Sequence, residues 1–326
     1  MKPTTNNMLR LAALALLACL HFAAQAQPFP TKPIRLIVPF VPGGNVDITA
    51  RTVAPALGEA LGQPIVIENR TGAAGMVGAQ ALLAAPADGH TLMMGSNSSL
   101  AVAPNLYPNW PYDPLKGIAP ISNLAVTPFV LVVKLALPAQ TVAEVIRLAK
   151  DRPGQLAMAS GGNGSSNHLV GELFQMMTGV KLSHVPYKGT GAALVDLAGG
   201  QVDLLFDQAS STVPNVRGGK IRAIAVASAG RQGALPDTPT FAEAGLKDFQ
   251  IDNFTGLVGP AGMPADAIAK VHAAAVKALA TPAVKERFAS LGVQPVGNTP
   301  EQWGAEIRAD LARWSQVIKA AGIKAE

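Results

Sequence analysis

The sequence predicts an α/β protein made of two similar lobes, and two junctions carry that prediction. An apolar run over 34–38 leads through two prolines into Gly43-Gly44-Asn45 and a helical pattern, and a second run over 156–160 leads into Gly161-Gly162-Asn163 and another. Such strand-to-helix junctions hold small anions, because glycine allows close backbone approach and the first helical N–H groups lack partners within the helix. Because the junctions are far apart in the chain, we expect two lobes that present helix N-termini to one cleft.

The first 26 residues have the pattern of a secretory signal peptide. Lys2 and Arg10 precede an apolar run over 11–22, and Ala24-Gln25-Ala26 supplies the small residues that signal peptidase requires. The run is too short to span a bilayer, and it is apolar all round, which disfavours a buried N-terminal helix. We therefore expect cleavage after Ala26 and export to the periplasm, with lipid attachment at Cys19 as the alternative.

Composition restricts the class of partner. The sequence has 26 Lys and Arg against 21 Asp and Glu, and two of the bases lie in the leader, so the mature chain would carry 24 minus 21, or +3. The bases form no run and no patch with aromatic residues, which disfavours nucleic acid, while a weak positive charge favours a small anion. The one cysteine lies in the leader, so we expect neither a disulfide nor a thiolate metal site in the mature chain.

The first lobe is predicted from alternating strand and helix patterns. The expected strands cover 34–38, 64–68 and 91–95, and the expected helices begin after Asn45 and cover 74–84. In the first helix, apolar residues recur at steps of three or four. This alternation predicts a parallel sheet buried on both faces, with ligands beyond the carboxyl ends of its strands. The segments 42–47, 69–75 and 96–99 would then surround the site.

The second lobe is predicted to lie between two extended crossings. A proline-rich connector without regular structure is expected over 104–120, followed by a crossing over 123–134 and a return crossing over 249–258. Thr141 and Glu144 have capping-box spacing at the start of a helix over 141–150. The other expected strands cover 156–160, 182–186, 202–206 and 221–227, and the other helices 165–177 and 190–198. Two crossings predict a hinge.

The expected domain limits follow from these crossings. Residues 27–124 would form the first part of lobe 1, 125–250 lobe 2, and 251–326 the return segment of lobe 1. The helices expected over 264–280, 282–290 and 300–320 would pack on the first lobe.

Two facing helix N-termini, each offering about half a positive charge and free N–H donors, could bind both ends of a dicarboxylate without an arginine. Asp47 is either an acid that complements its helix dipole or a ligand contact. Asp207 follows the strand expected over 202–206, and either aspartate could accept a hydrogen bond from a ligand amino or hydroxyl group. Arg70 and Lys188 either counter ligand charge or are exposed bases.

Ser165 is expected to cap its helix, with His168 in the first turn as either a packed residue or a ligand contact. Tyr187 either offers its hydroxyl or packs. A hydrolase that uses Ser165 or Ser166 with His168 is the rival class, although residues this close on one turn rarely form a nucleophile–base pair.

Known enzyme and metal motifs do not match. Gly162-Asn163-Gly164 lacks the third glycine of G-x-G-x-x-G, since Asn167 stands there, and His168 stands where G-x-S-x-G needs its last glycine. Ligand spacing is lacking among the four histidines of the mature chain, His90, His168, His184 and His272, so we expect no metal site. Because the enzyme motifs do not match either, we expect no cofactor and no enzyme activity.

Several motifs together resemble the Bug family, the periplasmic solute receptors of tripartite tricarboxylate transporters. They are the segment 33–40 with Pro42-Gly43-Gly44 and Asp47, Glu68-Asn69-Arg70 with Gly72 and Gly75, and Pro186-Tyr187-Lys188-Gly189. The resemblance continues through 200–203, 235–240 and 256–264, so it covers essentially the whole mature chain. It implies a Venus-flytrap (periplasmic-binding-protein) fold, with a mainly parallel sheet flanked by helices in each lobe, that closes on a small carboxylate and delivers it to a membrane permease. We expect a monomer.

Bug receptors bind the acid largely through backbone amides and ordered waters at two glycine loops, which correspond here to 43–47 and 161–168. The candidate ligand-binding residues are Val41, Gly43, Gly44, Asn45, Asp47, Ser96, Asn97, Gly161, Gly162, Gly164, Ser165, Ser166, His168, Tyr187 and Asp207. Asn45-Val46 replaces the small hydroxyl residues common in the family, and Asn69-Arg70-Thr71 lacks the usual proline. The first departure leaves the acid open: a di- or tricarboxylate, an amino acid or an aromatic acid. The alternative role is that of a receptor that reports its ligand to a sensor protein instead of delivering it to a permease.

Overall fold

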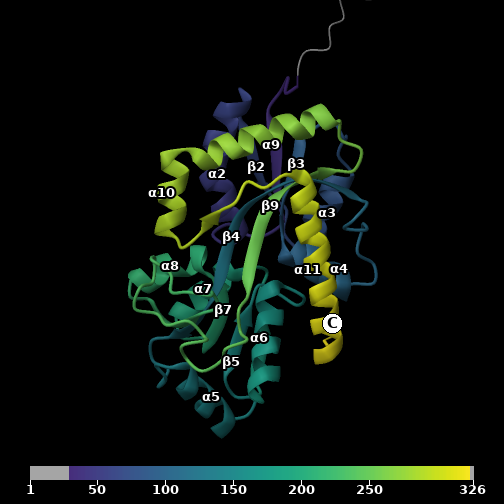
Figure 1. The fold of residues 1–326 in the computed structure, drawn as a ribbon. Helices are drawn as coiled ribbons and strands as arrows, with labels where there is room; N and C mark the ends of the chain where they lie inside the picture. Colours follow the sequence, from purple (N-terminus) through teal and green to yellow (C-terminus); the bar gives the residue numbers. More distant parts are fainter. Residues whose placement is uncertain (1–28, 324–326) are drawn as a thin grey trace, which may run out of the picture.

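The computed structural model describes residues 29–323, so the predicted signal peptide and its cleavage after Ala26 lie outside the described residues. The described chain forms two α/β lobes, one above the other in Figure 1, with β4 and β9 running between them. This is the two-lobed fold that the sequence predicted.

The first lobe is built on a sheet in the order β2-β1-β3-β9-β4. Its parallel strands β1, β2 and β3 cover Ile34–Val38, Ile65–Asn69 and Thr91–Ser96. Helix α2 covers Asn45–Leu61, and a 3₁₀ turn, Ala73–Gly75, leads into α3, Met76–Leu83. Helix α2 therefore starts at Asn45, at the glycine junction and one residue before the predicted start after Asn45.

The two passages between the lobes lie side by side. Strand β4, Ile118–Lys134, pairs antiparallel with β9, Asp252–Pro260, as far as Pro128, and from Phe129 it pairs with strands of the second lobe. The backbone N–H of Phe129 donates to the carbonyl of Ile251 at 3.4 Å, which joins the two passages. We propose that the first lobe gives way to the second at this change of partners.

The segment before β4 is more regular than predicted. A π-helical turn, Ser98–Val102, precedes the expected connector over 104–120. A short helix α4, Ala103–Leu106, occupies the start of the connector, and β4 begins at Ile118 inside it. Pro104 lies in the first turn of α4, where its missing N–H costs no hydrogen bond. Prolines alone therefore did not exclude a helix there.

The second lobe contains three parallel strands, β5, β6 and β7, at Ala157–Ser160, Ser183–Pro186 and Leu204–Gln208, with β4 and β8, Ile221–Val226, completing its sheet. Its helices α5, α6, α7 and α8 cover Val142–Asp151, Ser166–Thr178, Thr190–Ala198 and Ala209–Arg217. The capping box of Thr141 and Glu144 and the N-cap of Ser165 are confirmed. Helix α8 was not predicted, because its polar Ser210-Ser211-Thr212 and its internal Pro214 give no apolar stripe.

As far as residue 323, three helices and a short strand follow β9. They are α9, Ala265–Ala280, α10, Pro282–Ser290, β10, Gln294–Pro295, and α11, Pro300–Ala321. Helices α9 and α10 pack on α2 as expected. Helix α11 runs past both lobes in Figure 1: Trp303 Nε1 donates to the carbonyl of Leu257, and Trp314 shares an apolar cluster with Phe174 of α6. Helix α11 therefore packs on the first lobe as expected and also contacts α6 of the second lobe, because its apolar face is long enough to cover both.

Between residues 29 and 323, no single helix has the length and apolar composition needed to cross a membrane. Helices α9 and α10 have that length and composition only when taken together, and they are separated by a bend of 67°.

Candidate functional site

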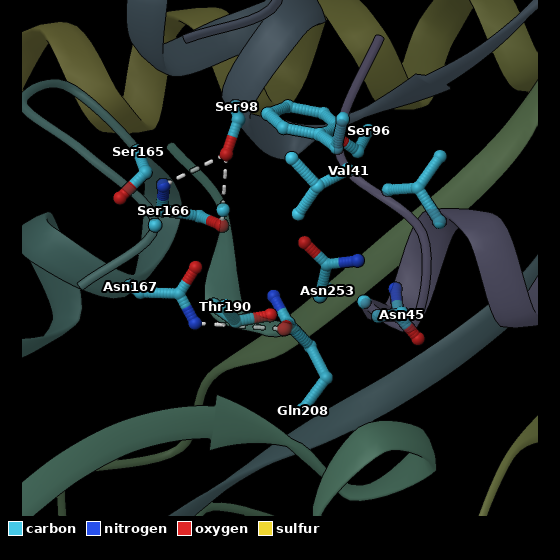
Figure 2. Close-up of a pocket in the computed structure, with 15 residues that line it drawn as sticks. Val41, Asn45, Ser96, Ser98, Ser165, Ser166, Asn167, Thr190, Gln208 and Asn253 are labelled. Atoms are coloured by element: carbon cyan, nitrogen blue, oxygen red, sulfur yellow. Dashed lines mark hydrogen bonds between the residues drawn. The ribbon is translucent and has the colours of Figure 1, made fainter. Parts of the chain in front are cut away.

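A small cavity lies between the lobes, and we call it the inner cavity (Figure 2). Its volume is about 30 Å³. It is lined by Phe40, Val41, Gly44, Asn45, Val46, Ser96, Ser98 and Asn253 from the first lobe, and by Gly161, Ser165, Ser166, Asn167, Gly189, Thr190 and Gln208 from the second. None of these described lining residues has a charged side chain, so any charge that the cavity stabilises must be met by dipoles.

Helix N-termini supply those dipoles. Within the described part of the chain, four lining residues are N-caps: Gly44 of α2, Ser165 of α6, Gly189 of α7 and Gln208 of α8. Each cap lies at or just after the carboxyl end of a parallel strand, which is where α/β folds place ligands. Because each helix N-terminus carries about half a positive charge and unpaired N–H groups, their convergence favours an anion.

The first glycine loop is held by Asp47. The Asp47 carboxylate accepts hydrogen bonds from the Gly43 N–H at 3.0 Å, Asn69 Nδ2 at 3.0 Å and Arg51 Nε at 2.9 Å. Burial alone would raise the pKa of Asp47, but these hydrogen bonds and the Arg51 charge outweigh it and lower that pKa. Asp47 does not line the cavity, so its place is behind the loop, where it orients the Gly43–Gly44 turn.

The second glycine loop is held by polar side chains beneath it. The Gly162 N–H donates to Ser160 Oγ at 3.0 Å, and the Gly164 N–H donates to His168 Nδ1 at 3.3 Å. The His168 ring stacks on His184 with 3.9 Å between ring centroids. Burial, helped by His184, lowers the pKa of His168 to about 4, so at neutral pH the ring is uncharged and can accept this bond. The imidazole therefore supports the loop.

Two other predicted residues, Asp207 and Asn97, lie behind the residues that line the inner cavity. Asp207 is fully buried and accepts hydrogen bonds from Ser211 Oγ at 2.6 Å and Asn167 Nδ2 at 3.2 Å. Burial raises the pKa of Asp207 to about 6 despite these bonds. Asn97 donates to Asp310 at 2.7 Å and accepts from the Phe254 N–H at 2.7 Å, so it joins β3 to α11 and β9. Neither residue lines the cavity.

The predicted residues thus divide into three groups. Those that line the inner cavity are Val41, Gly44, Asn45, Ser96, Gly161, Ser165 and Ser166. Gly162 and Tyr187 line a second cavity described below. Those that line neither are Gly43, Asp47, Asn97, Gly164, His168 and Asp207.

The list of candidate residues omitted eight lining residues: Phe40, Val46, Ser98, Asn167, Gly189, Thr190, Gln208 and Asn253. Val46, Ser98 and Asn167 lie within the predicted segments 43–47, 96–99 and 161–168, whereas the other five lie outside these segments. Gly189-Thr190 is a third strand-to-helix junction directly after the Tyr187-Lys188 motif, so that pattern could have identified it. Gln208 precedes α8. If a helix had been expected after the strand over 202–206, as after the other parallel strands, Gln208 would have been identified as its N-cap. Asn253 lies on the return crossing, where no local pattern indicates a site.

The lobes are in direct contact around the inner cavity. Ser98 Oγ of the first lobe accepts a hydrogen bond from the Ser166 N–H at 2.8 Å, and Figure 2 shows the pair. Asn45 accepts from Ser210 Oγ at 2.6 Å, and the Tyr107 hydroxyl donates to the carbonyl of Asn163 at 2.9 Å. The structure is therefore a closed arrangement of the two lobes.

A larger cavity of about 540 Å³ adjoins the inner cavity, and we call it the outer cavity. The two share the lining residues Phe40 and Gly161. Lys188 lines the outer cavity, whereas Arg70 is paired with Glu68. The two bases that the sequence analysis weighed together therefore have different surroundings.

Comparison with known proteins agrees with this geometry. A family model described as the tripartite tricarboxylate transporter family receptor, TctC, matches residues 49–323. The protein BugT of Bordetella pertussis (strain Tohama I) is 38% identical over 323 residues, which cover 98% of this chain and 99% of BugT.

Solved structures of periplasmic binding proteins are also similar to this chain. The structure of the periplasmic binding protein BugD matches with a TM-score of 0.88 at 32% identity, over 91% of this chain and 100% of that chain. The structure of R. palustris Rpa4515 with adipate matches with a TM-score of 0.88 at 35% identity, over 91% of this chain and 99% of that chain. The chain therefore belongs to the TctC family of tripartite tricarboxylate transporter receptors, a family of substrate-binding receptors.

Proposed function

We propose that this chain is a periplasmic receptor that binds a small carboxylate in the inner cavity and delivers it to the membrane permease of a tripartite tricarboxylate transporter. The observation that carries the proposal is the convergence of the N-caps Gly44, Ser165, Gly189 and Gln208 on a cavity without charged side chains. A carboxylate accepts hydrogen bonds only, and this cavity offers helix N–H groups together with hydroxyl and amide donors.

Two further observations support a carboxylate. No described lining residue is acidic, so nothing in the wall repels an anion. The relative Rpa4515, similar over almost its whole length, has been solved with adipate, a dicarboxylate. Closure of the lobes would exclude water and strengthen each contact between an N–H group and the bound anion, because the effective dielectric falls.

Delivery to a permease is proposed from the family alone, because TctC receptors are named for that transporter. A receptor that reports to a sensor protein would use the same cavity. Uptake of the identified acid by cells with and without this gene product would separate the two roles, since only a transport receptor is required for uptake.

A thermal-shift screen of the secreted protein against dicarboxylates, tricarboxylates, aromatic acids and amino acids tests the binding function. An acid present at about 100 times its dissociation constant should stabilise the protein by roughly 2.7 kcal/mol. Stoichiometric binding of a hit, measured by calorimetry, supports the receptor. Turnover of the hit without stoichiometric binding would favour the hydrolase instead.

A further inference from the structure

A partly buried carboxylate on α11 contacts the polypeptide that forms the wall of the inner cavity. Asp310 lies in the middle of α11 and does not itself line the cavity. Its Oδ2 atom accepts hydrogen bonds from Asn97 Nδ2 at 2.7 Å and from Trp314 Nε1 at 3.0 Å. Because Trp314 belongs to the same helix, the bond to Asn97 is the one that leads out of α11 towards the cavity.

Asn97 lies between two residues that line the inner cavity, Ser96 and Ser98. Strand β3 ends at Ser96, which pairs with Thr255 of β9, so the N–H of the neighbouring Phe254 extends beyond the last pair of these strands. Asn97 Oδ1 accepts this N–H at 2.7 Å. Because a buried N–H group without a partner is costly, this bond fixes Asn97 and β9 relative to each other.

The part of β9 that Asn97 contacts carries a lining residue of its own. Asn253 lies directly before Phe254 and lines the inner cavity (Figure 2). Its Nδ2 atom donates to the Phe254 carbonyl at 3.0 Å and to Thr255 Oγ1 at 3.3 Å. Thr255 Oγ1 also accepts from Asn45 Nδ2 at 3.0 Å, and Asn45 lines the cavity from α2. The positions of Asn253 and Asn45 therefore depend on the position of β9.

Helix α11 also contacts the return crossing on the other side of Asn253. Arg313 Nη2 donates to the carbonyl of Gln250 at 3.3 Å. Gln250 precedes Asn253 and Phe254 follows it, so α11 contacts this segment directly at one end and through Asn97 at the other. Because α11 also packs on the π-helical turn that follows Asn97, the position of the helix and that of the cavity wall are coupled.

We propose that Asp310 is a positioning residue of the ligand site. It acts through Asn97, which holds the end of β3 against β9 and thereby places Asn253 at the cavity. Asn97 donates this hydrogen bond, so position 310 must offer an oxygen acceptor, whereas a charge is not required. The inference rests on the proposed function, since it concerns affinity for the ligand that the inner cavity holds.

Amide hydrogen exchange tests the connection without a ligand. Asp310→Ala removes the acceptor for Asn97, so the Phe254 amide should exchange about tenfold faster or more than in the wild type, because Asn97 is then free to turn away. Asp310→Asn should keep the exchange rate of the wild type, since its amide oxygen can accept the same bond. An unchanged rate at Phe254 in Asp310→Ala would overturn the inference and leave the proposed function intact.

Calorimetric titration with adipate, the acid in the Rpa4515 structure, tests the effect on binding. Asp310→Ala should weaken binding about fivefold or more, and Asp310→Asn less than about twofold. The control is Trp314→Phe, which removes the other hydrogen bond to the same carboxylate oxygen and should leave the affinity within about twofold of the wild type. Equal losses in Trp314→Phe and Asp310→Ala would assign the effect to the packing of α11 and contradict the inference.

A double-mutant cycle separates action through Asn97 from general damage to the fold. Asn97→Ala should weaken binding at least as much as Asp310→Ala does. Adding Asp310→Ala to it should change the affinity by less than about twofold, because the connection is already broken. Additive losses would show that Asp310 does not act through Asn97. A wild type that binds an acid as tightly as all these variants removes the inference alone, whereas a wild type that binds no acid in the screen removes the proposed function and the inference with it.

Discussion

Ser98 of the first lobe caps helix α6 of the second lobe. Ser98 Oγ accepts a hydrogen bond from the Ser166 N–H at 2.8 Å, and its hydroxyl donates to Ser166 Oγ at 3.1 Å. The Ser166 N–H belongs to the first turn of α6, where no carbonyl of the helix can reach it. In the closed arrangement this donor is therefore engaged by the protein.

Ser98→Ala should accordingly weaken ligand binding by about two- to tenfold, because closure loses a hydrogen bond between the lobes. The control is Ser99→Ala, since the Ser99 hydroxyl bonds to Ser96 within the first lobe. Calorimetric titration of both variants checks the prediction. Equal losses in the two would mean that the contact between the lobes has no special part in closure.

Gly191→Ala should prevent full closure while leaving the second lobe intact. A Cβ at Gly191 would lie 2.8 Å from the carbonyl oxygen of Pro42 on the opposite lobe, a contact that backbone atoms must move to relieve. Alanine is otherwise favourable within α7, so the lobe itself should fold normally. We expect affinity to fall more than about tenfold, and the radius of gyration from small-angle scattering to stay large when ligand is added.

The control for Gly191→Ala is Gly304→Ala, another glycine within a helix, whose Cβ would meet Pro120 at an ordinary 3.5 Å. Normal compaction of the Gly191 variant on addition of ligand would show that the lobes close differently from this structure.

Asp47→Asn should cost about 1.5–3 kcal/mol of stability at neutral pH, because a carboxylate that accepts three hydrogen bonds is replaced by a neutral amide. Affinity should change by less than about tenfold, since Asp47 orients the loop and does not line the cavity. Arg51→Gln should cost less, because Arg51 is partly exposed and an exposed ion pair contributes about 1 kcal/mol or less.

The pH dependence of Asp47 has a definite sign. Because folding lowers the pKa of Asp47 below its ordinary 3.8, its contribution to stability is present above pH 3.8 and is lost as the pH falls through the folded pKa. Chemical unfolding of the wild type and Asp47→Asn should be measured at pH 7 and pH 2.5. The difference between their free energies of unfolding should be smaller at pH 2.5. A difference that does not depend on pH would assign the loss to packing.

Asp310→Asn should stabilise the protein at neutral pH. Burial raises the pKa of Asp310 to about 6, against the lowering effect of Arg313 and of the hydrogen bonds from Asn97 and Trp314. Because folding raises this pKa, the protonated carboxyl contributes stability that is fully present below pH 3.8 and is lost as the pH rises through about 6. The loss is at most about 3 kcal/mol, and the neutral amide should avoid it while its oxygen still accepts both hydrogen bonds.

Melting curves at pH 4 and pH 8 check the prediction for Asp310. The variant should exceed the wild type at pH 8 and match it at pH 4, and the exposed change Asp248→Asn should match the wild type at both. A variant that is less stable at both values would show that the charged carboxylate is the stabilising form.

Most of the fold could be predicted from the sequence, because its signals are local. The glycine junction before Asn45, the capping box of Thr141 and the N-cap of Ser165 each use residues within one turn of the helix that they start. Helix α8 was missed for the same reason: Ser210-Ser211-Thr212 and Pro214 carry no helical pattern, and packing against β4, β7 and β8 stabilises the helix instead.

The candidate site was predicted only where a junction marked it. Gly44, Gly161 and Ser165 could be found because a strand, a turn and a helix start follow one another in the chain. The same pattern could not tell which side chains face the cavity, so Asp47 and His168, which lie in first helical turns, were weighed as ligand contacts although both support a loop.

The sequence by itself therefore determined the elements, their order and the loops that end beside the cleft, since these depend on periodicity, capping and glycine turns. Only the tertiary structure decided which groups meet: Asn69 with Asp47, His184 with His168, and Ser98 with Ser166. These partners are separated by 22, 16 and 68 positions, so no local pattern relates them. Their contact follows from how the strands pair and how the two lobes close, because only that packing brings distant groups within hydrogen-bonding and stacking distance.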